Sequence, residues 1–101
     1  MQVKRNLSVE KLAQVAHILK AIAHPVRLEI LEALESEEPL MVSTIRERLK
    51  TPIEQSMLSH HLIKLKDKNI LQADKRGKHV FYRISDRQIL KIFDCMEQCD
   101  L

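Results

Sequence analysis

The sequence predicts one mainly α-helical domain with a single small β-hairpin, and three observations support this prediction. The chain has 101 residues, a length typical of one domain. It contains one glycine and three prolines, which favours helices joined by short connections over an all-β fold. Apolar residues recur at helical spacing along most of the chain, and strand-like runs stand only between residues 70 and 84. We therefore expect residues 1–101 to form one domain.

The first helix is expected over residues 8–23, after a short N-terminal arm. Ser8 is a suitable N-cap. The helix should end near Ala23, because the residue before Pro25 is disfavoured in the helical region. Pro25 then suits the first turn of a second helix, where its missing N–H is not needed. The apolar sets are Leu12, Val15, Ala16, Leu19, Ile22 and Ala23 in the first helix, and Leu28, Ile30, Leu31 and Leu34 in the second.

A short third helix, from about residues 41–43 to 49, precedes a helix predicted over residues 52–67. Thr51 and Glu54 have the spacing of a capping box, and Pro52 suits the first turn. One face of this helix is apolar, and the other carries short hydrogen-bonding groups followed by a cation. The apolar face consists of Ile53, Leu58, Leu62 and Leu65, and the polar face of Gln55, Ser56, Ser59, His60 and Lys64. Asn69 tolerates the left-handed conformation that often ends a helix.

A β-hairpin is predicted over residues 70–84, followed by a last helix over residues 86–100. The only glycine, Gly77, lies at the hairpin tip, where a positive φ is most often required. Alternation in the second strand places Val80, Tyr82 and Ile84 on one side. Ser85 or Asp86 is expected to cap the last helix, whose apolar residues are Ile89, Leu90, Ile92, Phe93 and Met96.

The predicted order is therefore α-α-α-α-β-β-α, in which a short helix, a tight connection and a second helix form a helix-turn-helix. The basic-tipped hairpin that follows makes it a winged helix-turn-helix. A helix with an apolar back and a small polar front fits the major groove of DNA. Taken alone, the segment 52–67 equally fits an ordinary amphipathic surface helix, and its neighbours favour the DNA-binding interpretation.

Charge and composition narrow the classes of function. The formal net charge is +3 and the pI about 9.0, which is compatible with a nucleic-acid partner. No apolar run is long enough to cross a membrane and no signal sequence is evident, so we expect a cytoplasmic protein. The histidines are scattered, with no cysteine nucleophile, paired carboxylates or glycine-rich phosphate loop beside them. We therefore expect a protein that is not an enzyme.

Three segments also resemble those of the ArsR-type (ArsR/SmtB) winged-helix repressors. They are LKAIAHPVRLEIL at residues 19–31, QSMLSHHL at residues 55–62 and RGKHVFY at residues 76–82. The resemblance covers nearly the whole chain, in the same order and with similar spacing. It implies a homodimer formed through the first and last helices, a recognition helix in the major groove of an operator, and repression that an inducer relieves.

The expected DNA contacts divide into base contacts and phosphate contacts. Gln can pair with adenine, Ser can donate or accept, and the Met57 side chain can touch a thymine methyl. His60 is expected to face DNA, while His61 packs inside and Arg27 is mainly structural. The expected base-reading residues are Gln55, Ser56, Met57, Ser59 and His60. The expected phosphate contacts are Thr44, Lys64, Lys75, Arg76 and Lys78.

The terminal helices carry more apolar residues than one small core can hide, which agrees with a homodimer. The expected interface residues are Leu12, Val15, Leu19, Ile89, Ile92, Phe93 and Met96. A protein-interaction module with the same fold is the alternative to a DNA-binding repressor.

The sequence shows no convincing metal site. Residues 40–44 contain no cysteine or histidine where the resemblance leads us to expect a soft-metal site, and Asp86 is better explained as a helix cap. Cys95 and Cys99 lie four residues apart on the last predicted helix. They are either small, inert interface residues or the thiols of a repressor that responds to a thiophilic metal ion or to redox conditions, and we favour the inert interpretation.

Overall fold

The computed structural model describes residues 5–99, in which four helices precede a hairpin and a last helix follows it. The helices before the hairpin are α1 (Val9–Ile22), α2 (Pro25–Ser36), α3 (Val42–Arg48) and α4 (Gln55–Asp67). The strands are β1 (Leu40–Met41), β2 (Leu71–Arg76) and β3 (His79–Ile84). A 3₁₀ turn, η1 (Arg87–Leu90), leads into α5 (Lys91–Gln98). Residue 100, the predicted end of the last helix, lies outside the described residues.

Local signals in the sequence place most helix ends. The Ser8 hydroxyl accepts a hydrogen bond from the Lys11 N–H at 3.0 Å, which confirms Ser8 as the N-cap of α1. Pro25 begins α2 as predicted, and the His24 side chain caps that helix by accepting from the Val26 N–H at 3.1 Å. Asn69 has a φ of 61° after the end of α4, as expected. Asp86 caps η1 by accepting from the Gln88 N–H at 3.0 Å.

Two predicted boundaries are wrong. The capping box at Thr51 does not form, because the Glu29 carboxylate on α2, and not that of Glu54, accepts from the Thr51 N–H, and α4 begins only at Gln55. The last helix begins with the 3₁₀ turn η1 and ends at Gln98, so Cys99 is an extended C-cap residue (φ −90°, ψ 125°). Cys95 and Cys99 therefore do not share a helical face as predicted.

The sheet has three strands in the order β1-β3-β2, one more than predicted. The two residues of β1 pair antiparallel with β3, Leu40 opposite Tyr82 and Met41 opposite Phe81. The hairpin pairs Leu71 with Ile84 and closes with Arg76 opposite His79. The predicted alternation in β3 is confirmed, since Tyr82 and Ile84 are buried and Arg83 is exposed.

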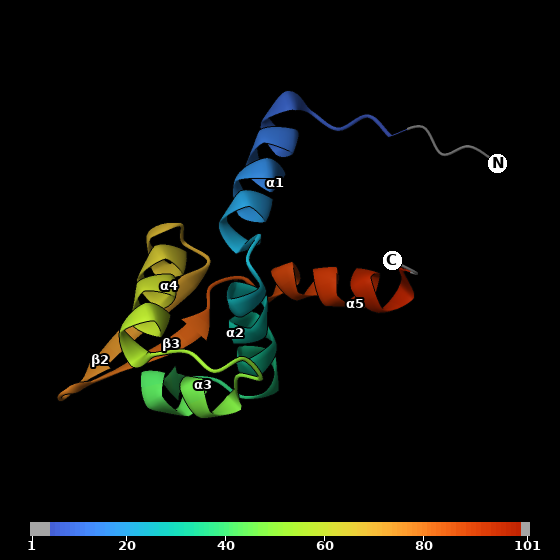
Figure 1. Ribbon diagram of the computed structural model, residues 1–101. Coiled ribbons are helices and arrows are strands. Elements are labelled where there is room, and N and C mark those ends of the chain that lie inside the picture. Colours follow the sequence, from blue (N-terminus) through green and yellow to red (C-terminus); the bar gives the residue numbers. More distant parts are fainter. Residues whose placement is uncertain (1–4, 100–101) are drawn as a thin grey trace.

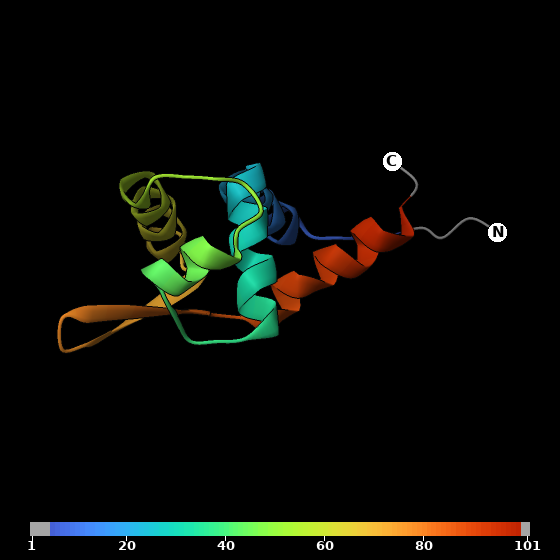
Figure 2. The ribbon, with the colours of Figure 1, turned by 60° about the horizontal axis from the view of Figure 1, so that its bottom comes forward.

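The hydrophobic core lies where α2, α3 and α4 meet the sheet. Its fully buried side chains are Ile22 of α1, Ile30, Leu31 and Leu34 of α2, Ile45 of α3, Leu58, Leu62 and Leu65 of α4, and Leu71 of β2. Helix α1 extends away from this body, and α5 points away on the side opposite the hairpin (Figures 1 and 2). In α1 only Ala21 and Ile22 are buried, and in α5 no residue is.

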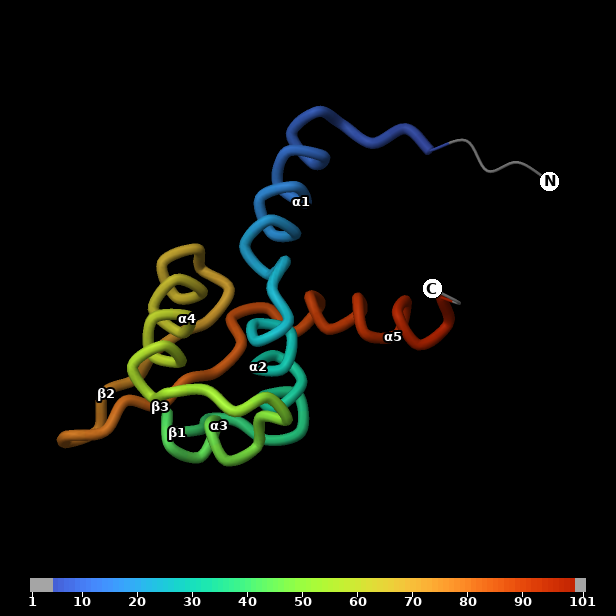
Figure 3. The backbone as a smooth tube through the Cα atoms, viewed as in Figure 1, coloured from blue at the N-terminus to red at the C-terminus, as the bar shows by residue number. Residues whose placement is uncertain are grey.

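Helices α3 and α4 with the connection between them form the helix-turn-helix, and the β2–β3 hairpin forms the wing beside it (Figure 3). The predicted winged helix-turn-helix is therefore the observed fold. Among residues 5–99, no helix reaches the length and apolarity needed to cross a membrane.

Gly77 carries the wing turn with a φ of +63°. A Cβ atom there would meet nothing within 4 Å, so replacement by alanine meets a backbone penalty and no clash. We expect Gly77→Ala to lower the free energy of unfolding by about 1–2 kcal/mol. Urea unfolding would measure this, with Gly77→Asn as a control that tolerates the left-handed region better. An alanine variant as stable as the wild type would contradict the expectation.

Candidate nucleic-acid interface

Helix α4 has one buried face and one exposed face, divided as its sequence predicts. The buried side chains are Leu58, His61, Leu62 and Leu65. The predicted base-reading residues lie on the other side, where Gln55, Ser56, Met57 and His60 are exposed and Ser59 is half-buried. Met57 is 51% exposed, so it does not fill the core. Ile63 lies on the same face, 49% exposed, and was not predicted to be there, although its helical phase beside Ser56 and Ser59 indicates it.

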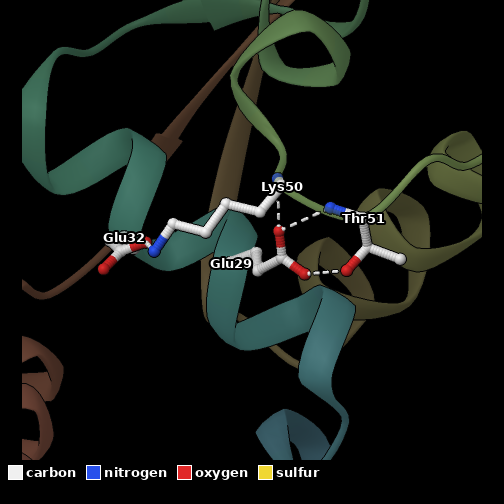
Figure 4. Close-up of polar contacts among 4 residues, drawn as sticks. All are labelled: Glu29, Glu32, Lys50 and Thr51. Carbon is white, nitrogen blue, oxygen red and sulfur yellow. Dashed lines mark hydrogen bonds and ion pairs between the residues drawn. The ribbon is translucent and has the colours of Figure 1, made fainter.

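The connection between α3 and α4, residues 49–54, is held by side chains from α2 and α3. The Glu29 carboxylate of α2 accepts three hydrogen bonds from Lys50 and Thr51 (Figure 4). The Arg46 side chain of α3 donates through Nε to the Ile53 carbonyl at 2.7 Å. No sequence pattern indicated the role of Glu29, because its partners follow it by more than twenty residues.

His61 anchors the buried side of α4 to the junction of α1 and α2. Its Nδ1 atom accepts a hydrogen bond from Arg27 Nε at 3.1 Å, and Arg27 Nη1 donates to the Ala21 carbonyl at 2.8 Å. The His24 ring lies 4.5 Å from the His61 ring, centroid to centroid. Burial, followed by the charges of His24, Arg27 and His60, lowers the pKa of His61. The structure thus agrees with the predicted division between an outward His60, an inward His61 and a structural Arg27.

The wing presents three cations around Gly77, but they are not equivalent. Arg76 Nε lies 3.0 Å from the Asp74 carboxylate, and the guanidinium stands 5.0 Å from the centre of the Phe81 ring. Lys75 and Lys78 are exposed, and in the described part of the chain neither forms an ion pair. Lys64 is exposed near the end of α4, and Thr44 is half-buried on α3. Lys75 and Lys78 therefore present an uncompensated positive charge, whereas Asp74 compensates part of the charge of Arg76.

The cysteines do not form a metal site with other side chains in residues 5–99. Cys95 and Cys99 are both exposed free thiols. Within that range no group of three or more His, Cys, Asp or Glu side chains is arranged to hold a metal ion.

The predicted interface residues of the first and last helices divide into two groups. Leu12, Val15 and Leu19 of α1 and Met96 of α5 are exposed. Ile89, Ile92 and Phe93 are half-buried and pack against the edge of the core. An apolar stripe on α1, made of Leu12, Val15 and Leu19, therefore has no cover within residues 5–99.

Comparisons with known proteins agree with this geometry. Residues 22–71 match the model of a helix-turn-helix domain family. An HTH-type transcriptional regulator of Methanocaldococcus jannaschii is 39% identical over 89 residues, which cover 85% of this chain and 98% of that protein. The transcriptional repressor PagR of Bacillus anthracis is 33% identical over 86% of this chain and 85% of its own. The crystal structure of PagR superposes with a TM-score of 0.73 over 88% of this chain and 99% of PagR.

A further solved structure carries the family name. It is the homodimeric winged helix-turn-helix DNA-binding domain of Mb0332 from Mycobacterium bovis, described as a possible ArsR-family transcriptional regulator. It is 26% identical, with a TM-score of 0.71 over 96% of this chain and 87% of that one. The fold, the two-faced α4, the wing and these relatives together show that the chain belongs to the ArsR/SmtB family of winged helix-turn-helix DNA-binding transcriptional regulators.

Proposed function

We propose that the protein is a repressor that binds a two-fold symmetric double-stranded DNA operator as a homodimer, and that it acts by binding rather than by catalysis. The exposed polar face of α4 beside the cationic wing carries this proposal, because it joins a surface that can read bases to a surface that can bind phosphates. We propose repression of transcription, and not activation, because PagR is a transcriptional repressor and is 33% identical.

In this proposal the N-terminal half of α4 enters the major groove. Gln55 can form the bidentate pair that recognises adenine, and Ser56 and Ser59 can donate or accept at either base pair. Met57 and Ile63 offer the exposed apolar contacts that suit thymine methyl groups. His60 lies on the same face.

The phosphate contacts are proposed for Lys64 on α4, for Lys75, Arg76 and Lys78 on the wing, and for Thr44 on α3. Lys75 and Lys78 should contribute most, because Asp74 offsets part of the charge of Arg76. Such contacts position the protein on DNA and make its affinity depend on salt, and they do not select a sequence.

The proposed dimer uses the uncovered faces of α1 and the last helix. A groove of about 560 Å³ lies between them, and Val15, Ile18, Leu19, Ile89 and Ile92 are among its lining residues. A second copy of the chain is the proposed occupant, because the groove joins the exposed stripe of α1 to the last helix and the domain of Mb0332 is homodimeric. Two symmetric α4 helices would then match two half-sites of an operator.

The test separates base contacts from phosphate contacts. A binding duplex is first selected from a random DNA pool with the wild-type protein, and affinities are then measured for it across a range of salt. Gln55→Ala should lower affinity for the selected duplex about tenfold for each protomer bound and leave the salt dependence unchanged. Lys75→Gln with Lys78→Gln should reduce the slope of log affinity against log salt by about 2 for each protomer bound.

A scrambled duplex of the same length is the control for sequence reading. Gln55→Ala should leave its affinity unchanged, while the lysine pair should weaken both duplexes alike. Wild-type protein that binds selected and scrambled duplexes equally would overturn the proposed function.

A further inference from the structure

We propose that Glu29 is a positioning residue for DNA recognition, which holds the start of α4 at the angle that base reading requires. The inference rests on the proposed function and adds to it a residue that lies outside the DNA-facing surface. Glu29 is half-buried on α2, the helix that contributes the fully buried Ile30, Leu31 and Leu34 to the core. It therefore ties the start of α4 to a helix that is firmly packed in the core.

The contacts of Glu29 are concentrated on two adjacent residues. Its Oε1 atom accepts from the Lys50 N–H at 2.6 Å and from the Thr51 N–H at 3.1 Å, and its Oε2 atom accepts from the Thr51 hydroxyl at 2.6 Å (Figure 4). An ionised carboxylate only accepts hydrogen bonds, so Glu29 can satisfy all three donors, the two N–H groups and the hydroxyl. Both N–H groups belong to an irregular segment, where no helix or strand supplies a partner.

The position of Thr51 decides where α4 starts. The helix begins four residues later at Gln55, and its N-cap residue, Glu54, forms no side-chain capping bond. The connection is therefore fixed from outside the helix, by Glu29 of α2 at Thr51 and by Arg46 of α3 at Ile53. Gln55 and Ser56, the first two predicted base-reading residues, follow these contacts directly. A shift of the connection would move them first.

The charge state of Glu29 suits this role. The hydrogen bond from the Thr51 hydroxyl, the two backbone N–H groups and the charge of Lys50 lower the pKa of Glu29 against the opposing effect of burial. The carboxylate therefore stays ionised at neutral pH.

Glu32 provides a matched comparison on the same helix. It forms an ion pair with Lys50 Nζ at 3.0 Å, with side chains 50% and 76% exposed. Exposed ion pairs of this kind add little to the stability of a protein. Replacing Glu29 or Glu32 by alanine removes the same side chain and the same charge, so the general electrostatic effect on DNA affinity has the same sign, and the scrambled duplex measures its size for each variant. Only Glu29→Ala removes the hydrogen bonds to the backbone and the hydroxyl of the connection, whereas Glu32→Ala removes only the exposed ion pair with the Lys50 side chain.

The experiment measures dissociation constants by fluorescence anisotropy for the duplex selected by wild-type protein and for a scrambled duplex. Glu29→Ala should weaken binding to the selected duplex about tenfold or more relative to Glu32→Ala, with equal effects of the two variants on the scrambled duplex. Glu29→Gln should restore part of the loss, since its amide oxygen can still accept from the two backbone N–H groups. Thermal melting of each variant reports folding separately.

Three outcomes decide the inference. The inference is overturned if the ratio of affinities for the selected and scrambled duplexes is the same in Glu29→Ala and Glu32→Ala. It is also overturned if Glu29→Ala loses affinity for both duplexes equally, because that would indicate only a smaller folded fraction. If Glu29→Ala does not fold, Thr51→Val is compared with Thr51→Ser instead. Thr51→Val should lower the ratio of affinities for the selected and scrambled duplexes, and Thr51→Ser should keep it. Equal ratios in the two variants would overturn the inference. Wild-type protein that does not distinguish the duplexes would instead overturn the proposed function.

Discussion

Replacing Leu19 by aspartate should convert the protein into a folded monomer that has lost most of its affinity for operator DNA. Leu19 is 48% exposed on the α1 stripe and does not belong to the buried core. A protomer should therefore fold normally with aspartate at this position. A two-fold dimer would bury the exposed half of both copies of Leu19, and losing these contacts should cost about 1.5–3 kcal/mol of association energy, before the cost of placing a charge in the interface.

The loss of DNA affinity follows from the loss of the second half-site. In a dimer, binding of one α4 places the other beside its half-site, which raises overall affinity by about 10²–10⁴-fold over a single contact. We therefore expect Leu19→Asp to weaken operator binding by at least about 100-fold. Sedimentation velocity at micromolar protein would report the mass, and anisotropy the affinity.

Ile63→Asp is the matched control for the sedimentation measurement. Ile63 is 49% exposed, so the same charge is introduced at an apolar position of the same exposure, but on α4 instead of α1. It should remain dimeric. The proposed interface is wrong if Leu19→Asp sediments as a dimer, or if both variants become monomers.

The parts of the fold that follow from local chemistry could be predicted from the sequence. Ser8 caps α1, Pro25 begins α2, and Asn69 and Gly77 take positive φ values, because each residue type favours its conformation with little help from distant segments. The separation of an exposed His60 from a buried His61 follows from helical phase alone.

The parts that depend on distant partners could not be predicted. Strand β1 is two residues long and exists through its pairing with Tyr82 and Phe81, some forty residues later. The predicted capping box at Thr51 was wrong for the same reason, since the Glu29 carboxylate on α2 takes the Thr51 N–H that Glu54 would accept in a capping box. A local pattern shows which bonds a side chain can make, and the packed structure decides which bond it makes.

The candidate DNA-binding site contains features of both kinds, some set by the local sequence and some set by distant partners. The polar face of α4 and the basic tip of the wing are local patterns, and the structure exposes both as the sequence indicates. The unequal wing cations are a tertiary feature, because the pairing of Arg76 with Asp74 and Phe81 depends on how the hairpin closes. The individual DNA contacts stay predictions until binding is measured.

Replacing His61 by leucine should lower the free energy of unfolding by about 1.5–3 kcal/mol, the range measured for hydrogen bonds to charged groups. His61 is 6% exposed and accepts from Arg27 Nε. Leucine cannot accept, so the Arg27 guanidinium would face an apolar side chain in a part-buried place. The link from α4 to the Ala21 carbonyl at the end of α1 would be lost with it.

Acid should break the same link in the wild-type protein. The pKa of His61 lies below its ordinary value of 6.5 in the folded state, chiefly through burial. The unfolded chain therefore takes up a proton first, so this contribution to stability is complete above pH 6.5 and declines as the pH falls through the folded pKa. Protonation also turns Nδ1 from an acceptor into a donor that faces the Arg27 donor and places a cation beside it.

The variant His61→Asn separates the effect of protonation at residue 61 from the effect of losing its hydrogen bond with Arg27. Asparagine offers Oδ1 as an acceptor close to the position of Nδ1 and does not titrate, so this variant should lose less stability than His61→Leu. Urea unfolding between pH 7.5 and 5.0, at one protein concentration, should show a decline in the wild type that is reduced in His61→Asn. The pKa of Glu29 is also lowered, from 4.5, so its contribution changes only below this window.

His60→Asn is the control, because His60 lies on the exposed face of α4 and accepts nothing from Arg27 in the structure. It should keep most of the acid decline of the wild type, because the charge of His60 is the smallest of the effects that lower the pKa of His61. A decline of equal size in His61→Asn would show that protons taken up elsewhere weaken the protein, and that the buried histidine does not couple α4 to pH.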